Sequence, residues 1–475
     1  MVLSIKAVPL PTKSNKTTNM RKALLILIGG MLLATSTASA QDLQADGQPA
    51  KTRLWTLQAC IDYALENNIS LQKSKLQKQS ATEDLKGAKG ALLPTVNAST
   101  NQSLGYQPWK DSGISTVTNG TVNTKVDKTS YNGSYSLSGQ WTVWNGNRNH
   151  NTVKLDKMLE QEADLTVRET ANTIQERIAQ LYAQILYLTE SVKVNEQMLE
   201  TSRKNEERGQ EMFNVGKMSK ADLAQLSAER AEDEYAIVEA KGQLAETKLD
   251  LKQLLEITDE EDFDVAIPDV SDSEILAEIP SLQSVYEEAL VGRPEIERLQ
   301  LAIERTGVSV SIAKAGWMPT VNLTGGVTTS SNSLSSNGWG TQVKTNLNSS
   351  LGLGVTVPIY DGRATKTAVN KAKINQQQAR LSLQDRQKTL YADIQDYWVT
   401  ALTNQEKYKA ASTSVESAQL SYDLLSEQFR LGLKNIVELM TGKDKLALAQ
   451  QNQLQSKYLA LYNQQMLKFY QSGQI

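Results

Sequence analysis

The chain has 475 residues, with 50 Lys and Arg against 53 Asp and Glu and a formal net charge of −3. This mildly acidic balance argues against a nucleic-acid partner, because nucleic-acid binding needs a strongly basic surface. The single cysteine, Cys60, excludes an intramolecular disulfide, and we interpret it as a small buried residue of a helix.

The first 40 residues have the composition of an export signal. Basic residues precede an apolar run over 23–34, and Ala-Ser-Ala follows at 38–40. This predicts a secretion signal over 1–40, followed by an N-terminal extension over 41–53, with Met20 as an alternative start. The other interpretation is a membrane anchor, but the apolar run is too short to span a bilayer comfortably. No later segment is apolar enough to predict a transmembrane helix.

A predicted helix over about 56–89 leads to Pro94 and a β segment over 94–145, which is rich in Ser, Thr, Asn, Gly and aromatic residues. Apolar or small residues alternate with polar ones over 131–143, which predicts a strand with two different faces. The polar face carries few charges, and tryptophans gather in the β segments. We therefore favour a membrane barrel over the edge of a soluble sandwich.

A long helix is predicted over 148–214, because the segment has no proline and a single glycine. At about 1.5 Å per residue its length would be on the order of 100 Å. Its apolar residues step by four and three, which is a heptad seam that packs against neighbouring helices: Val167, Ala171, Ile174, Ile178, Leu181, Ile185, Leu188 and Val192. Gly216 then marks a tip turn over 215–222, and a helix returns over about 220–256.

An acidic segment over 258–279 follows. It could form structure around the outside of the helices, and we favour the simpler interpretation of a solvated surface. The same order of elements then returns. A helix over about 281–315 leads to a β segment over 319–361, which begins at Pro319 and includes Pro358. Gly362 precedes a long helix over 363–430, Gly432 lies in a tip turn over 431–438, and a helix follows over about 436–470.

The second series is a copy of the first. Ala-Leu-Leu-Pro-Thr-Val-Asn at 91–97 returns as Gly-Trp-Met-Pro-Thr-Val-Asn at 316–322, and the interval from Gly146 to Gly362 equals that from Gly216 to Gly432. The chain therefore divides into repeat 1 over 54–257, a linker over 258–279 and repeat 2 over 280–475. A duplicated unit with an incomplete core is expected to pack against its copy.

Two β segments supply four strands, which cannot close a barrel, and an open sheet edge is not tolerated in lipid. Several chains must therefore associate. Two chains would give eight strands with a filled interior, whereas three would give twelve and could leave a lumen. The geometry predicts a trimer if the protein is a conduit.

The chain resembles the TolC-like outer-membrane efflux and secretion channels in the order and spacing of three features. These are the repeated Pro-Thr before the strands, Val-Pro-Ile-Tyr-Asp-Gly-Arg at 357–363, and the two tip motifs at 215–222 and 431–438. The resemblance covers nearly all of the mature chain. It implies an α+β membrane protein with two repeats of helix, β-hairpin, long helix and helix. It also implies a homotrimer, in which a 12-stranded barrel in the outer membrane continues as a long α-helical coiled-coil barrel in the periplasm.

By the same resemblance, the protein would be the passive exit channel of a tripartite efflux pump or type I secretion system. Its partners would be a periplasmic adaptor (membrane fusion protein), an inner-membrane pump and outer-membrane lipid. The acid of the periplasmic entrance corresponds to Glu438, and the polar links between neighbouring coils correspond to Asp222 and Lys434. The alternative is that these are ordinary solvated charges. Phe429 and Thr441 stand where the family often has a tyrosine and a further acid.

Two other functional classes are less well supported. A periplasmic adaptor or structural coiled-coil protein without a pore would also have long helices, but it usually has one helical hairpin amid soluble β domains. An enzyme is not expected, because the only histidine, His150, has no partner histidine and the sequence has no metal-binding spacing, nucleotide loop or nucleophile motif. We expect no cofactor.

Overall fold

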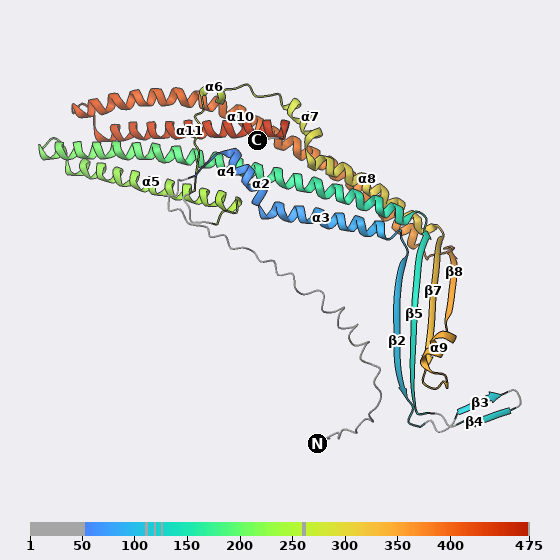
Figure 1. Cartoon of the computed structure of the whole chain (residues 1–475). Helices are drawn as coiled ribbons and strands as arrows, with labels where there is room; N and C mark the ends of the chain where they lie inside the picture. The colour runs from blue at the N-terminus through green and yellow to red at the C-terminus, as the bar shows by residue number, and fades with distance from the viewer. Residues whose placement is uncertain (1–52, 110–112, 118–119, 125–126, 259–262, 474–475) are drawn as a thin grey trace, which may run out of the picture. The chain divides into compact units, whose positions relative to one another are not determined.

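The computed structural model describes residues 53–109, 113–117, 120–124, 127–258 and 263–473 (Figure 1). The expected secretion signal lies outside these residues. The helices are α2 Leu57–Asn67, α3 Ile69–Gly90, α4 Arg148–Asn214, α5 Lys220–Leu254, α6 Asp272–Ile275, α7 Leu282–Gly292, α8 Pro294–Lys314, α9 Trp339–Thr345, α10 Ala364–Arg430 and α11 Ile436–Ser472, with a 3₁₀ turn η1 over Ala315–Trp317. The strands are β1 Arg53–Trp55, β2 Thr95–Tyr106, β3 Gly113–Val117, β4 Gly120–Thr124, β5 Thr129–Trp144, β6 Phe263–Val265, β7 Thr320–Asn332 and β8 Asn348–Thr356.

The two long helices, α4 and α10, have 67 residues each. The predicted heptad seam of α4 is buried along most of its length, and Ile178 and Ile185 are fully enclosed. The equivalent residues Leu390, Ile394 and Ala401 of α10 are also fully buried. Each long helix packs against the helix that returns along it, α5 or α11, and α8 packs against both long helices. None of the described helices is both long and apolar enough to cross a membrane.

The helices expected before the two β segments are each broken, which corrects the sequence prediction. The first breaks at Asn68, whose backbone is extended and whose Oδ1 accepts hydrogen bonds from the amides of Ser70 and Leu71, so that it caps α3. The second breaks at Arg293, because Pro294 disfavours a helical conformation for the residue before it and suits the first position of α8.

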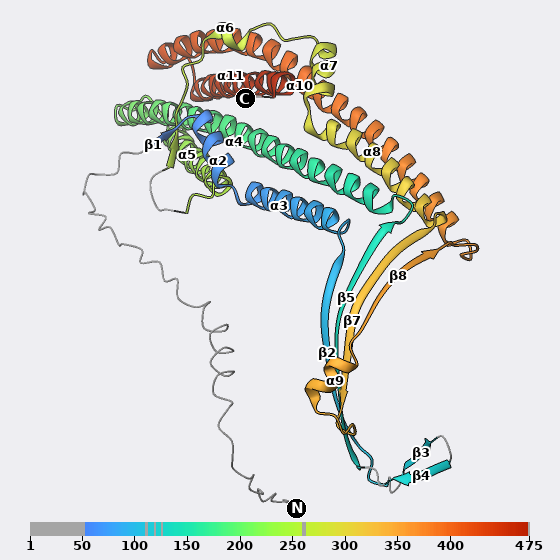
Figure 2. The ribbon, with the colours of Figure 1, turned by 45° about the vertical axis from the view of Figure 1, so that its right-hand side comes forward.

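The central sheet has the strand order β2-β5-β7-β8, and all its neighbours are antiparallel (Figure 2). One face is mainly apolar in its middle part, where Leu137 pairs with Ala98 and Val327, and Leu323 pairs with Leu353. The opposite face carries Ser, Thr, Asn and Gly. Within the described residues β2 and β8 form the two outer edges of the sheet.

Three features differ from the predicted β segments. Along the chain, a small hairpin, β3–β4, follows β2 and precedes β5, and the short helix α9 follows β7 and precedes β8. Strand β8 ends at Thr356, so that Val357 and Ile359 lie beyond it. Trp339, one of the tryptophans of the second β segment, lies in a helix and not in a strand, because it is the first residue of α9.

The acidic linker also contains structure that the sequence analysis did not predict. Strand β6 pairs in parallel with β1, which places the end of the N-terminal extension in a two-stranded sheet. In the following α6, Ile275 is fully buried and its carbonyl accepts hydrogen bonds from Gln405 and Gln464. The linker is therefore attached to α10 and α11 at this point, although many of its acids remain on the surface.

Candidate functional site

The strand-to-helix junctions have the same backbone conformation in both repeats. Gly146 and Asn147 have φ values of 67° and 62°, and Gly362 and Arg363 have values of 60° and 71°. Two successive left-handed residues turn the chain sharply from β5 into α4 and from β8 into α10, and glycine is the residue that tolerates the first of them best. Pro94 and Pro319 immediately precede β2 and β7, and Pro358 follows β8.

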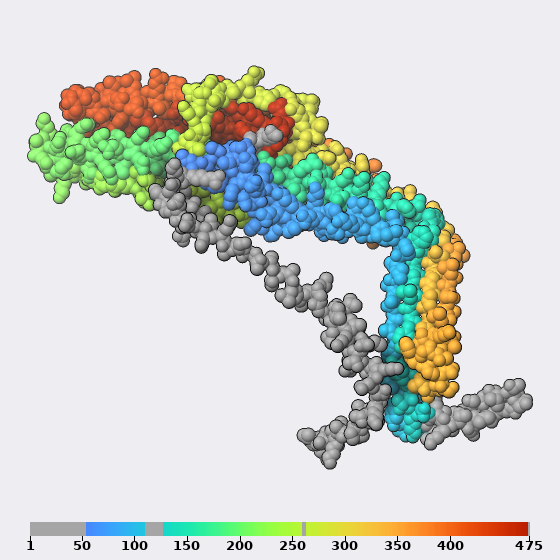
Figure 3. All heavy atoms as spheres, viewed as in Figure 1, coloured from blue at the N-terminus to red at the C-terminus, as the bar shows by residue number. Residues whose placement is uncertain are grey.

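The two tip turns lie at the same end of the long helices (Figures 1 and 3). Gly216 has a φ of 74° and Gly432 a φ of 75°. Their amides donate to the carbonyls of Phe213 and Phe429, both at 2.9 Å, which closes the ends of α4 and α10. These identical turns bring Asp222, from repeat 1, and Lys434 and Glu438, from repeat 2, to one end of the molecule.

Asp222 lies in the first turn of α5 and is partly exposed. Its amide donates to Oγ of Ser219 at 3.0 Å, and the Ser219 hydroxyl donates back to Oδ2 of Asp222 at 2.8 Å. This is a helix N-cap, where a carboxylate also favours the helix dipole. Asp222 therefore already has the local role that is expected of an exposed acid at a helix start, and a link from Asp222 to another chain would be additional to this role.

Glu438 has a similar local role in α11. Its amide donates to Asn435 Oδ1 at 2.9 Å and its carboxylate accepts from the Asn435 amide, which together form a capping box. Lys434 donates to its Oε1 at 2.9 Å, and the two side chains are 39% and 41% exposed. The hydrogen bond from Lys434 is the main cause that holds the pKa of Glu438 below its ordinary value of 4.5. The described chain thus pairs Lys434 with Glu438.

Behind the tips, an apolar cluster joins the two helical hairpins. Its buried members come from α4, α5, α10 and α11: Met198, Leu226, Tyr422, Phe429, Ile436, Leu439 and Leu446. Phe429 is 3% exposed, so the ring at the position often occupied by a tyrosine contributes packing. Tyr422 accepts a buried hydrogen bond at 3.1 Å from the amide of Asn205 on α4, which supplies a polar link between the hairpins.

A buried charge cluster, which the sequence analysis missed, lies next to this apolar cluster. Lys443 of α11 is 3% exposed, donates to Asp233 Oδ2 at 2.7 Å and to Ser202 Oγ at 2.9 Å, and forms an ion pair with Glu229. We call these four residues the Lys443 cluster. It connects repeat 2 to both helices of the repeat 1 hairpin. The sequence did carry a signal, because Lys443 occupies a seam position of α11 between Ile436 and Leu446.

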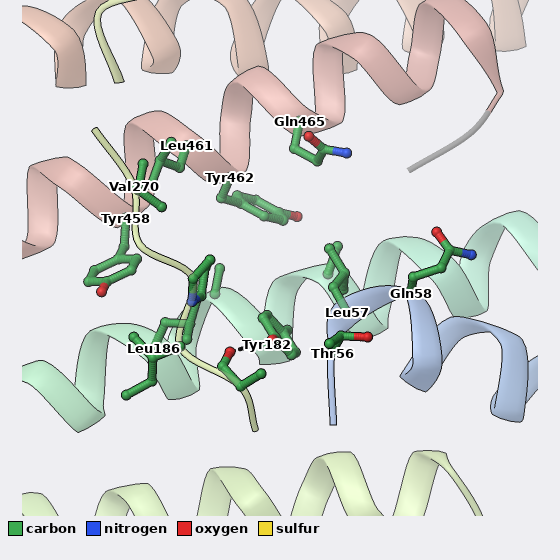
Figure 4. Close-up of a pocket in the computed structure, with 15 residues that line it drawn as sticks. Thr56, Leu57, Gln58, Tyr182, Leu186, Val270, Tyr458, Leu461, Tyr462 and Gln465 are labelled. Carbon is green, nitrogen blue, oxygen red and sulfur yellow. Dashed lines mark hydrogen bonds between the residues drawn. The ribbon is translucent and has the colours of Figure 1, made fainter. Parts of the chain in front are cut away.

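A second candidate site is an open pocket of about 530 Å³ between α4, α11, the start of α2 and residues 266–270 (Figure 4). Its wall is mainly apolar and contains no Asp, Glu, Lys, Arg or His. The hydroxyl of Tyr182 donates to the Ala266 carbonyl at 2.5 Å, and burial raises the pKa of Tyr182 to about 12. A neutral tyrosine that holds the linker in place is a structural feature, and we assign no chemistry to this pocket.

Two other residues have plain structural descriptions. Cys60 is fully buried in α2, as expected, and burial raises the pKa of its thiol to about 12. His150 is exposed in the first turns of α4. Among the described residues, no group of three or more His, Cys, Asp and Glu side chains is placed to hold a metal ion.

Comparison with known proteins places this geometry in one family. The family model described as "Outer membrane efflux protein" matches residues 60–256 and 285–470. The outer membrane efflux protein BepC of Brucella suis biovar 1 (strain 1330) is 23% identical over 399 residues, which cover 83% of this chain and 80% of BepC. The outer membrane protein TolC of Escherichia coli (strain K12) is 23% identical over 460 residues, which cover 94% of this chain and 86% of TolC.

Solved structures show the same fold. The structure of CusC aligns with a TM-score of 0.75 and 17% identity, covering 90% of this chain and 95% of CusC. The outer membrane protein VceC from Vibrio cholerae aligns with a TM-score of 0.70 and 16% identity, covering 86% of this chain and 94% of VceC. The predicted fold class is confirmed by these comparisons.

Proposed function

The chain belongs to the outer membrane efflux protein family, and on that basis we propose that three copies form one hollow exit channel. The protein lies in the outer membrane and extends into the periplasm, and its family is one of channels rather than enzymes. The observation that carries the trimer is the four-stranded sheet with outer edges β2 and β8. Pairing β2 of one copy with β8 of the next would remove every edge, and twelve strands leave room for a lumen.

We assign the channel to the outer end of a tripartite efflux pump or a type I secretion system. Its tips, with the turns at Gly216 and Gly432, would meet a periplasmic adaptor that connects the channel to an inner-membrane pump. The polar sheet face, rich in Ser, Thr and Asn, would line the lumen and suit hydrophilic or amphiphilic solutes. Transport through it would be passive. The compared proteins give no support to the alternative of an adaptor without a pore.

We further propose that Asp222 and Lys434 link neighbouring chains and help to keep the tip closed. Lys434 already pairs with Glu438 in its own chain, so the link would be shared between two carboxylates. Such partly exposed pairs contribute little stability individually, about 0–1 kcal/mol, which suits a closure that a partner protein can open. The buried apolar cluster behind the tips would supply most of the remaining resistance to opening of the tip.

The channel is tested by ion conductance of the purified protein in planar lipid bilayers. We expect the unmodified protein to conduct weakly and the double variant Asp222→Asn, Lys434→Gln to conduct more. The two substitutions neutralise both side chains of the proposed link at nearly constant size. Lys217→Gln, an exposed change in the same tip region, is the matched control and should leave conductance unchanged. No current in either the unmodified protein or the double variant would exclude a channel.

Ion selectivity tests the role of Glu438. We expect Glu438→Gln to lower the cation-to-anion permeability ratio and Lys434→Gln to raise it, each by about twofold to fivefold, because each substitution removes one charge close to the path of the ions. The pKa of Glu438 lies below 4.5, so its carboxylate stays charged above that pH and is neutralised only as the pH falls through the lowered value. The ratio should therefore hold from pH 7 to about 5 and fall only at lower pH. Equal permeability ratios in the Glu438→Gln and Lys434→Gln variants would show that Glu438 does not act at the channel entrance.

A further inference from the structure

The short helix α9 covers one end of the sheet, on the face that also carries the apolar residues. Trp339 donates from Nε1 to the Tyr135 hydroxyl at 3.3 Å, and the two rings meet edge to face at 6.1 Å between centroids. The Thr329 hydroxyl donates to the Val343 carbonyl at 2.7 Å. Tyr135 and Thr329 are paired residues of β5 and β7, so both point to the same face. Figures 1 and 2 show α9 beside β7, at the end of the sheet away from the long helices.

The register shows that this face is the one expected to contact lipid. Moving from Tyr135 toward the helices, the next paired residues on it are Leu137 with Val327, then Gly139 with Gly325, then Trp141 with Leu323. Moving the other way, the next pair is Gly133 with Ser331, which is polar and small. Helix α9 therefore lies where the continuous apolar surface gives way to small and polar residues, with Tyr131 and Leu104 beyond them on the same face.

The spacing of aromatic residues agrees with the thickness of a membrane. Trp144, near the helices, and Tyr135, under α9, are nine residues apart on β5. A bulge in β5 leaves their partners on β7, Thr329 and Val321, eight residues apart. At about 3.4 Å per residue and a tilt of about 40°, eight to nine residues span about 21–23 Å along the membrane normal, close to the apolar band of about 25 Å between the aromatic girdles of outer-membrane barrels. Trp339 is thus at the level of the outer girdle.

The exposed side of α9 suits a layer of lipid headgroups. Trp339 remains 59% exposed although its ring contacts Tyr135. Lys344 is exposed in the last turn and is the only charged residue between 320 and 356. The inner side is held by Gln342, which is buried and bonds to the backbone of Asn332 and Asn337. A rigidly held helix that presents an indole and an ammonium group matches an interfacial anchor.

We propose that α9 lies in the outer interface of the membrane, with the Trp339 indole among the lipid headgroups and Lys344 near their phosphates. The occupant of this surface is lipid, because the surface borders the apolar sheet face and its single charge is complementary to phosphate. The proposal depends on the membrane-facing assignment of that sheet face, which the Leu351→Arg variant in the Discussion tests separately.

Site-specific fluorescence in vesicles tests the proposal. Cys60 is fully buried, so a cysteine introduced on the surface takes up an environment-sensitive NBD label selectively. Full-length protein labelled at Thr341→Cys, on α9, is reconstituted into phosphatidylglycerol or phosphatidylcholine vesicles. Matched proteins are labelled at Leu351→Cys, in the middle of the apolar face, and at Lys220→Cys, at the periplasmic tip.

For the α9 label we expect quenching about twofold stronger by lipids with a doxyl group high on the acyl chain than by lipids with one near the terminal methyl. The label at Leu351→Cys should show the opposite order, and the label at Lys220→Cys should be quenched by neither. Adding Trp339→Ser should abolish the shallow quenching at Thr341→Cys, and Lys344→Gln should reduce it in phosphatidylglycerol alone.

Two results would overturn the proposal. If the Thr341→Cys label is quenched by aqueous iodide as strongly as the tip label and by neither lipid, α9 lies in water above the membrane. If it is protected from iodide and also from both lipids, a neighbouring copy covers it. In both cases normal depth quenching at Leu351→Cys would show that the channel itself is inserted correctly, so the failure would belong to α9 alone.

Discussion

Replacing Lys443 by alanine should destabilise the tip region by about 3–5 kcal/mol, the usual cost of removing one partner from a buried ion pair. The substitution leaves Glu229 and Asp233 facing a cavity without their cation, and both belong to α5, whereas Lys443 belongs to α11. It also removes the partner of Ser202 on α4. One truncation therefore disconnects three helices from two different repeats.

The lysine is charged under all physiological conditions. Burial by itself lowers the pKa of Lys443, but the hydrogen bonds and charges of Asp233 and Glu229 outweigh burial and raise the pKa above its ordinary value of 10.5. A raised pKa contributes stability that is fully present below the unfolded value and is lost as the pH rises through the folded one. This contribution of Lys443 should therefore stay constant from pH 7 to pH 9.

Hydrogen exchange of the α5 and α11 amides near the tip measures this local stability. Lys445→Ala is the matched control, because Lys445 lies two residues away and is exposed, and its effect should stay within about 0.5 kcal/mol. The triple variant Lys443→Met, Glu229→Gln, Asp233→Asn should recover most of the loss, since no buried charge is left unpaired. Equal exchange in Lys443→Ala and Lys445→Ala would show that the Lys443 cluster contributes nothing to the tip.

The second large effect concerns the membrane. Leu351→Arg should cost about 2–4 kcal/mol of stability in lipid, the penalty for a charge on the lipid face near the bilayer centre. Leu351 pairs with Gly325, which lies midway along β7 between the partners of Trp144 and Tyr135, the two aromatic levels. In the single chain the Leu351 side chain is 79% exposed, as expected for a residue whose contacts are with lipid.

The adjacent residue is the matched control. Ser350 pairs with Gly326 and points to the opposite, polar face of the same strand. Ser350→Arg should leave assembly unchanged and shift ion selectivity toward anions, because the new charge would lie in the lumen. The amount of heat-modifiable trimer in isolated outer membranes, followed by urea unfolding in vesicles, measures the difference. If Ser350→Arg is the more damaging change, the two faces of the sheet have been assigned the wrong way round.

Much of the architecture could be read from the sequence because the signals are local and repeated. The absence of proline over 148–214 and its heptad seam predicted α4, and equal intervals between matched glycines predicted a second copy. Alternation within the β segments identified two-faced strands, and the family resemblance added the function and the location. The breaks at Asn68 and Arg293 were missed, although the capping asparagine and Pro294 are local signals that could have indicated them.

Contacts between distant segments were decided only by the tertiary structure. Periodicity states which side of a helix is buried, but the stagger and rotation of one helix against another determine which side chains meet. This is why the ion pairs of Lys443, a residue 241 positions from Ser202, were not predicted. The placement of α9 on the apolar sheet face depends in the same way on strand register, because a shift of one residue would have turned Thr329 and its neighbours toward the lumen.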